Sequence, residues 1–295
     1  MGYLFLLIAL FAGTAKGYCG KKASGYANNF GDAILANTIR MILCTVIGFV
    51  IILASDGLSA LIPSKEMLFI AALSGISTAF LVVSWLISVK KSAYMMLDIF
   101  LMLGVLIPLT ASSIFFNEAI KPTQWVGAAV LLAAVVIMCS YNNSIKTKIS
   151  LPSFILLLIC GIANGVSDFS QKLFVKNIPD SSVAVFNFYT YIFAALVLAI
   201  SYAVTRKTTE STENTDSKKI FVFILIMAIC LFANSYFKTI AAKYLSAVQL
   251  YPLNQGCSLI LSAIMSAVLF KEKLTAKDVI GMITAFIGLL IINLL

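Results

Sequence analysis

The chain has 295 residues, of which 61% are hydrophobic and 11% charged, with a net charge of +9 and a mean hydropathy of +1.03. Soluble domains average about 45–50% apolar and about 25% charged residues, so this composition excludes an ordinary soluble protein and indicates an integral membrane protein. The positive residues are scattered singly or in pairs between apolar runs, which excludes a nucleic-acid-binding surface.

Ten stretches are long and apolar enough to be membrane helices, which need about 20 residues. The first lacks a basic segment before its apolar residues, so we predict a retained span and not a cleaved signal peptide. The Thr-, Ser- and Glu-rich stretch 206–219 is predicted to be a solvated loop. The predicted spans, in chain order, are 3–20, 32–54, 67–88, 93–114, 123–141, 152–174, 183–205, 220–240, 246–270 and 275–294.

The chain lacks the residue patterns of a catalytic or metal site. It has no histidine, and its six cysteines lie in or beside apolar runs without the spacing of a zinc site. A Walker A motif is also absent, so any transport would be driven by a gradient or be passive. We therefore predict no catalytic residue, no metal and no cofactor.

The sequence repeats itself. The stretch FNEAIKPTQWVG (116–127) matches FKEKLTAKDVIG (270–281), which pairs Glu118 with Glu272, and GTAKG (13–17) matches GIANG (161–165). Each copy holds five predicted helices, an odd number, so the copies 1–145 and 146–295 are expected to insert with opposite orientations. Such inverted repeats are typical of secondary transporters. We expect Glu118 and Glu272 to be turn and surface residues at opposite faces.

These stretches resemble the ten-helix EamA-like members of the drug/metabolite transporter superfamily over essentially the whole chain. The two Glu-containing turns resemble the turn before the last helix of each half, and LANTIRMILCTVIGFVI resembles the second helix, including Arg40. The resemblance implies a secondary transporter that moves small metabolites, often outward, across the cell membrane. Small four-helix relatives carry a first-helix glutamate for proton-coupled drug export, whereas the first-helix charge here is Lys16.

Six charged residues lie deep within predicted spans, where a charge is costly unless it is paired, hydrated or functional. We expect Lys172 and Lys238 to extend toward nearby helix ends. Lys16 is expected to meet Asp168 or Asp98 in a central cavity, and Asn164 occupies the position equivalent to Lys16 in the second copy. The predicted cavity residues are Lys16, Arg40, Trp85, Asp98, Asn164, Asp168, Asn234, Tyr236, Tyr251, Asn254 and Gln255.

Such a cavity suits an anion, a zwitterion such as an amino acid, or an aromatic metabolite. A lipid or lipid-linked sugar flippase of the same fold is the alternative, and a membrane enzyme acting on lipid is less favoured because the acidic residues are dispersed. The expected partners are a small-molecule substrate and the bilayer, with the chain acting as a monomer or homodimer. Most Lys and Arg lie in the odd-numbered loops, which predicts cytoplasmic odd loops. The resemblance implies the reverse, with both termini inside, and we favour it.

Overall fold

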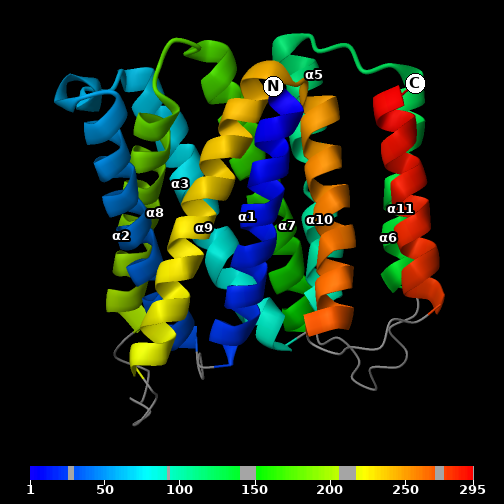
Figure 1. Ribbon diagram of the computed structural model, residues 1–295, viewed down its shortest axis with the longest axis horizontal. Helices are drawn as coiled ribbons and strands as arrows, with labels where there is room; N and C mark the ends of the chain where they lie inside the picture. The colour runs from blue at the N-terminus through cyan, green and yellow to red at the C-terminus, as the bar shows by residue number, and fades with distance from the viewer. Residues whose placement is uncertain (26–29, 92–93, 140–150, 206–216, 270–275, 295) are drawn as a thin grey trace.

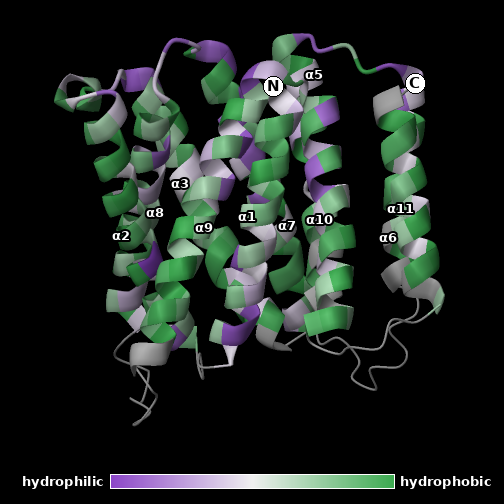
Figure 2. Ribbon diagram, viewed as in Figure 1, coloured by the Kyte–Doolittle hydropathy of each residue, from purple (hydrophilic) through white to green (hydrophobic). Residues whose placement is uncertain are grey.

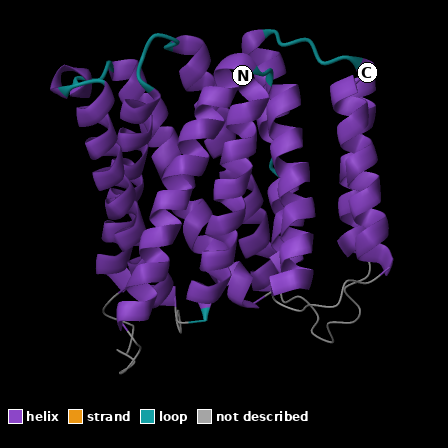
Figure 3. Cartoon of the chain, viewed as in Figure 1, coloured by secondary structure: helices purple, strands orange, loops and turns teal. Residues whose placement is uncertain are grey.

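The computed structural model describes residues 1–25, 30–91, 94–139, 151–205, 217–269 and 276–294, and within these ranges it is all-helical (Figure 1, Figure 3). A short 3-10 turn, η1 (Leu58–Leu61), follows the second helix. The α-helices are α1 (Gly2–Ser24), α2 (Phe30–Ser55), α3 (Lys65–Lys91), α4 (Tyr94–Leu103), α5 (Leu106–Phe116), α6 (Pro122–Cys139), α7 (Leu151–Asn177), α8 (Val183–Thr205), α9 (Ser217–Tyr244), α10 (Ala247–Leu269) and α11 (Ala276–Leu294).

Seven of these helices are long and apolar enough to cross a membrane: α1, α2, α3, α7, α8, α9 and α10. Three shorter apolar segments, Phe100–Phe116, Pro122–Ala134 and Val279–Ile292, overlap the remaining predicted spans. Large apolar side chains such as Phe11, Phe80 and Ile283 are more than half exposed. Hydrophobic residues cover most of the helix surfaces in Figure 2. The all-helical membrane fold is therefore confirmed.

The predicted fourth span, 93–114, is wrong as one continuous helix, because the chain breaks between α4 and α5. Pro108 has no N–H with which to reach the carbonyl of Gly104, and its ring clashes with a helical carbonyl at that position. The Gly104 carbonyl instead accepts a hydrogen bond from Ile107 N at 3.1 Å, and Val105 N bonds to Met102 O at 3.0 Å. These tighter bonds end one helix and begin the next.

Close backbone packing holds this break against α7. A Cβ added to Gly104 would lie 2.1 Å from the Gly161 carbonyl oxygen, and one added to Gly161 would lie 2.3 Å from the Phe100 carbonyl oxygen. A Cβ on Gly165 would similarly lie 2.2 Å from the Gly104 oxygen. The absence of side chains at these glycines lets two helices approach at backbone distance, as small residues do in membrane bundles.

The helix contacts form a symmetric pattern. We compared the two halves by treating α1, α2, α3, α4–α5 and α6 as equivalent, in that order, to α7, α8, α9, α10 and α11. The α1–α9 contact then maps onto α7–α3, α3–α8 onto α9–α2, and α1–α10 onto α7–α4/α5. The α2–α8, α6–α11 and α4/α5–α10 contacts map onto themselves. Both termini lie at one end of the bundle together with the α5–α6 turn (Figure 1). We call this end the terminal face.

Candidate functional site

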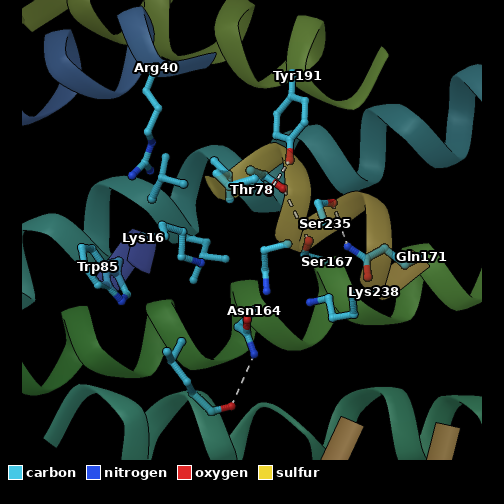
Figure 4. A pocket seen from close by; sticks show the side chains of 15 residues that line it. Lys16, Arg40, Thr78, Trp85, Asn164, Ser167, Gln171, Tyr191, Ser235 and Lys238 are labelled. Carbon is cyan, nitrogen blue, oxygen red and sulfur yellow. Dashed lines mark hydrogen bonds between the residues drawn. The ribbon is translucent and has the colours of Figure 1, made fainter. Parts of the chain in front are cut away.

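A polar cavity lies among the helices, in two adjoining compartments of about 80 and 60 Å³. The larger is bounded by α1, α2, α3, α4, α7, α8 and α9, and the smaller also reaches α10 (Figure 4). Both halves of the chain therefore contribute to the wall. The two compartments share Lys16, Trp85, Leu101, Asn164, Asn234 and Lys238.

Polar residues of α7 form one side of the larger compartment because they recur at helical spacing. Asn164, Ser167 and Gln171 lie three and four residues apart, which places them on one helix face. The Ser167 hydroxyl lies 3.4 Å from the Thr78 hydroxyl, and Asn164 Nδ2 donates to the Leu101 carbonyl at 3.5 Å. The wall of α7 is thus tied to α3 and α4.

The α9 side of the wall is fixed by a chain of hydrogen bonds. Gln171 Nε2 donates to Ser235 Oγ at 3.3 Å, and Ser235 Oγ donates to Asn187 Oδ1 at 2.7 Å. Asn234 Nδ2 donates to the Ala9 carbonyl at 2.7 Å, across the contact between α9 and α1. These bonds hold four helices, α1, α7, α8 and α9, in register around the cavity and orient the amide groups that line it.

An ion pair closes the wall between α7 and α9. Lys238 Nζ lies 2.5 Å from Asp168 Oδ1, and the Asp168 side chain is completely buried. The Tyr251 hydroxyl on α10 donates to the Asp168 backbone carbonyl at 2.7 Å. Lys238 is therefore an ion-pair partner of Asp168, and the expectation that Lys238 extends to a helix end is wrong. The expected meeting of Lys16 with Asp168 or Asp98 stays a prediction.

Three residues that line the cavity carry a buried polar atom with no hydrogen-bond partner among the described residues: Arg40 Nε, Gln171 Oε1 and Asn254 Oδ1. Buried polar groups in native proteins are almost always satisfied by protein or by ordered water. Unsatisfied atoms gathered around one cavity indicate a place that holds water or a polar ligand.

The predicted cavity residues fall into four groups. Asp168 and Tyr251 support the wall from behind, and Tyr236 packs between Phe232 and Phe237 away from it. The side chain of Asp98 lies outside the described residues. The residues that line the cavity are Lys16, Arg40, Trp85, Asn164, Asn234, Asn254 and Gln255, and their role in binding stays a prediction.

Sequence reasoning missed other lining residues. The signal for Ser167 and Gln171 was available, since they share the spacing of Asn164 and Asp168 on α7. Thr78 and Tyr191 carried no such signal, because neighbouring hydroxyl residues such as Ser77 and Thr190 lie beside them and the sequence does not show which of these faces the cavity. The lining residues that were not predicted to be in the cavity include Thr78, Ser167, Gln171, Tyr191, Ser235, Lys238 and Ser258.

A second charged cluster lies at the terminal face, around the α5–α6 turn. Glu118 Oε1 lies 3.1 Å from Lys172 Nζ and 3.2 Å from Lys176 Nζ, and Glu118 Oε2 accepts the Ala247 N–H at 2.9 Å. Lys172 Nζ also donates to the Leu245 carbonyl at 2.8 Å. Lys172 does extend toward the nearby end of α7, but it is buried and meets Glu118 there instead of solvent. Glu118 lies in the turn as predicted, but it is a partly buried bridging residue and not a surface one.

The environment of Glu118 has opposing electrostatic effects. Partial burial alone would raise the pKa of the carboxyl group. The Ala247 N–H and the ammonium groups of Lys172 and Lys176 outweigh that effect and hold the pKa below its ordinary value. The carboxylate is therefore ionised at neutral pH and joins the first half of the chain to α7 and α10.

An apolar groove of about 550 Å³ lies apart from this cluster, between α1, α10 and α11. Its lining includes Leu7, Phe11, Ile260 and Phe286. Leu10 lines both this groove and the smaller polar compartment, so the two spaces are neighbours.

Comparisons with known proteins support a membrane transport fold. Residues 151–294 match the EamA-like transporter family, which is part of the drug/metabolite transporter superfamily. A solved structure described only as a crystal structure of a protein aligns with a TM-score of 0.76 at 14% identity, over 99% of this chain and 96% of the other. No curated protein matches this chain.

Proposed function

Because residues 151–294 carry an EamA-like transporter domain, we propose that the chain is a secondary transporter that moves small organic solutes by alternating access. The solutes we propose are amino acids or other zwitterionic or anionic metabolites, moved outward across the cytoplasmic membrane. The observation that carries the proposal is a polar cavity walled by both halves of an otherwise apolar bundle. The direction and the choice of membrane rest on the family resemblance.

The symmetric helix packing supports two inverted repeats, 1–145 and 146–295, as the basis of alternating access. Two buried asparagines support it at the level of single residues. Asn37 on α2 donates to the Ala33 carbonyl of its own helix and to Val82 of α3. Asn187 on α8 donates to the Val183 carbonyl and accepts from Ser235 of α9. In each half a buried asparagine thus bonds its own helix and the equivalent neighbouring helix, although Asn37 donates to α3 and Asn187 accepts from α9.

The size of the cavity also supports a moving structure. Binding pockets for drug-sized ligands usually measure about 300–1,000 Å³, well above the 80 and 60 Å³ of the two compartments. A metabolite of ordinary size would enter only after the helices separate on one side. The structure therefore resembles a nearly closed state in a transport cycle.

Counterflow in proteoliposomes tests the proposal. Liposomes that contain the protein are loaded with a mixture of unlabelled amino acids and carboxylates. They are then diluted into a buffer that contains one of these solutes in labelled form, and we expect the label to accumulate transiently inside the liposomes. Ser167→Trp should abolish counterflow, because the indole fills the larger compartment. Thr110→Trp, at an exposed position of α5, should leave it intact. Failure of every solute to show counterflow would contradict the proposal.

A lipid or lipid-linked sugar flippase is the second candidate, and the apolar groove beside the cavity is the observation that favours it. Such a groove would hold an acyl chain while the polar head occupies the adjoining compartment. Dithionite quenching of a fluorescent lipid in proteoliposomes distinguishes the two functions. Protein-dependent flipping without solute counterflow would select the flippase.

A further inference from the structure

Among the described residues, Arg40 differs from the other buried cations, Lys172 and Lys238. Its side chain on α2 is only 3% exposed, its Nε has no hydrogen-bond partner, and no described residue forms an ion pair with its guanidinium group. Lys238, in contrast, is paired with Asp168, and Lys172 is paired with Glu118. A buried charge without a counterion is destabilising unless something else supplies the opposite charge.

The position of Arg40 indicates where that charge would come from. Figure 4 shows the side chains of Arg40 and Lys16 entering the larger compartment from α2 and α1. The described residues that line this compartment include no acid. Asp168 is buried behind the wall, and its Oδ1 is already engaged by Lys238. The compartment therefore has excess positive charge and room for a small group.

We infer that the larger compartment binds the oxyanion group of a small organic anion, a carboxylate or a phosphate, with Arg40 as its direct partner. The planar guanidinium donates paired hydrogen bonds that match either group. Lys16 adds a second positive charge. Trp85 and the neighbouring amides line the space that the remainder of the bound anion would occupy. This inference rests on the proposed transport function and narrows its substrates to net anions.

The same geometry argues against zwitterionic amino acids as the preferred solutes. An ammonium group inside the cavity would need a carboxylate or several oxygen acceptors. The described lining offers amide and hydroxyl oxygens but no ionised acid, and Lys16 and Arg40 would repel the added charge. A solute with one or two negative charges and no positive charge fits the cavity better.

A ligand panel on the purified protein tests the inference. Benzoate and phenyl phosphate are compared with benzamide, which is neutral, and phenylalanine, which is zwitterionic, by thermal shift and by calorimetry. We expect at least one anion to raise the unfolding temperature, since a ligand that binds only the folded state stabilises it. The stronger of the two anions identifies the preferred oxyanion. Binding of benzamide or phenylalanine as tightly as both anions would overturn the inference.

Variants link the binding to Arg40. We expect Arg40→Gln to raise the Kd of the binding anion at least tenfold, and Arg40→Lys to raise it as well because the paired geometry is lost. Lys65→Gln removes a positive charge from an exposed position and should change the Kd by less than twofold. Ligand-free Arg40→Gln should unfold at a higher temperature than the unsubstituted protein, since an unpaired buried charge is removed.

The outcomes separate this inference from the transport proposal. Unchanged anion binding in Arg40→Gln would overturn the inference, and if that variant does not fold, Arg40→Lys decides the same point. If Arg40→Gln leaves the counterflow of a zwitterionic or neutral solute intact, the anion site is contradicted but the proposed transport function is not. The absence of counterflow with every solute would contradict the proposed transport function itself.

Discussion

The ion pair between Asp168 and Lys238 leads to a prediction at the scale of single residues. Asp168→Asn leaves the Lys238 ammonium buried without its counterion, which we expect to cost about 3–5 kcal/mol of stability. Lys238→Met in the same chain should recover most of the loss, because neither charge then remains to be paired. The readout is the thermal unfolding temperature of purified Asp168→Asn, Lys238→Met and the double variant.

The control for this set of variants is Asp180→Asn. It removes an acid from an exposed position between α7 and α8 and should leave the unfolding temperature nearly unchanged. Additive losses in the double variant would mean that the two side chains stabilise the protein independently. In that case the close contact in the structure would not be an energetic pair.

Single residues also show where sequence reasoning ends. Lys16, Arg40 and Asn164 could be placed in a cavity because each interrupts a long apolar run well away from predicted helix ends. Lys238 was placed near a helix end because the predicted span stopped at 240, whereas α9 continues to Tyr244. The partner of Lys172 could not be predicted, since Glu118 reaches it from a turn more than fifty residues away.

At the scale of helices, the contact between α4 and α7 depends on glycine. Gly161→Ala would place a methyl group 2.3 Å from the Phe100 carbonyl oxygen, and backbone atoms cannot move aside as a flexible side chain can. We expect a loss of about 1–3 kcal/mol, as in other overpacked sites. Thermal unfolding of the purified variant measures it.

Gly25→Ala is the matched control, because its nearest neighbour would be the Lys22 carbonyl oxygen at 3.5 Å and its backbone is right-handed helical. Equal stability of the two alanine variants would show that α4 and α7 separate easily. That result would weaken the structural account of the break between α4 and α5, which was not predicted from the sequence.

The α5–α6 turn predicts a dependence of stability on pH. Because the folded pKa of Glu118 lies below its ordinary value of 4.5, its ionised form stabilises the folded state above that pH. The contribution is lost as the pH falls through the folded pKa. Glu118→Gln should therefore lower the unfolding temperature at pH 7. The corresponding loss in the free energy of unfolding is on the order of 1 kcal/mol, because the cluster is partly exposed.

The difference between Glu118→Gln and the unsubstituted protein should shrink as the pH falls below 4.5, and unfolding scans from pH 3 to pH 7 measure it. Glu66→Gln, an exposed acid on α3 hydrogen-bonded to Asn177, provides the comparison. A difference that stays constant over this range would show that the carboxylate charge is not what links the turn to α7 and α10.

At the scale of the whole molecule, the helices and their order were predictable because each membrane span needs its own apolar run. The doubled Glu-containing turn also indicated two halves, and the exchange symmetry of the helix contacts supports them. The cavity was harder to predict, since its wall combines isolated residues from eight helices that only tertiary packing brings together.

Inverted repeats make a topological prediction, because the two Glu-containing turns must lie on opposite sides of the membrane. Single cysteines at Lys121→Cys and Lys273→Cys, in a chain whose six native cysteines are replaced by serine, report the side of each turn. We expect a membrane-impermeant maleimide to label one variant in intact cells and the other only after permeabilisation. Labelling of both from the same side would contradict the inverted arrangement.

The same experiment decides the orientation. Most lysines and arginines lie in the loops on the Lys273 side, which the positive-inside rule would place in the cytoplasm. The family resemblance implies that the terminal face, with Lys121, is cytoplasmic. We favour this second orientation and expect Lys121→Cys to be protected in intact cells. Protection of Lys273→Cys instead would show that the charge distribution governs insertion, while leaving the inverted repeat intact.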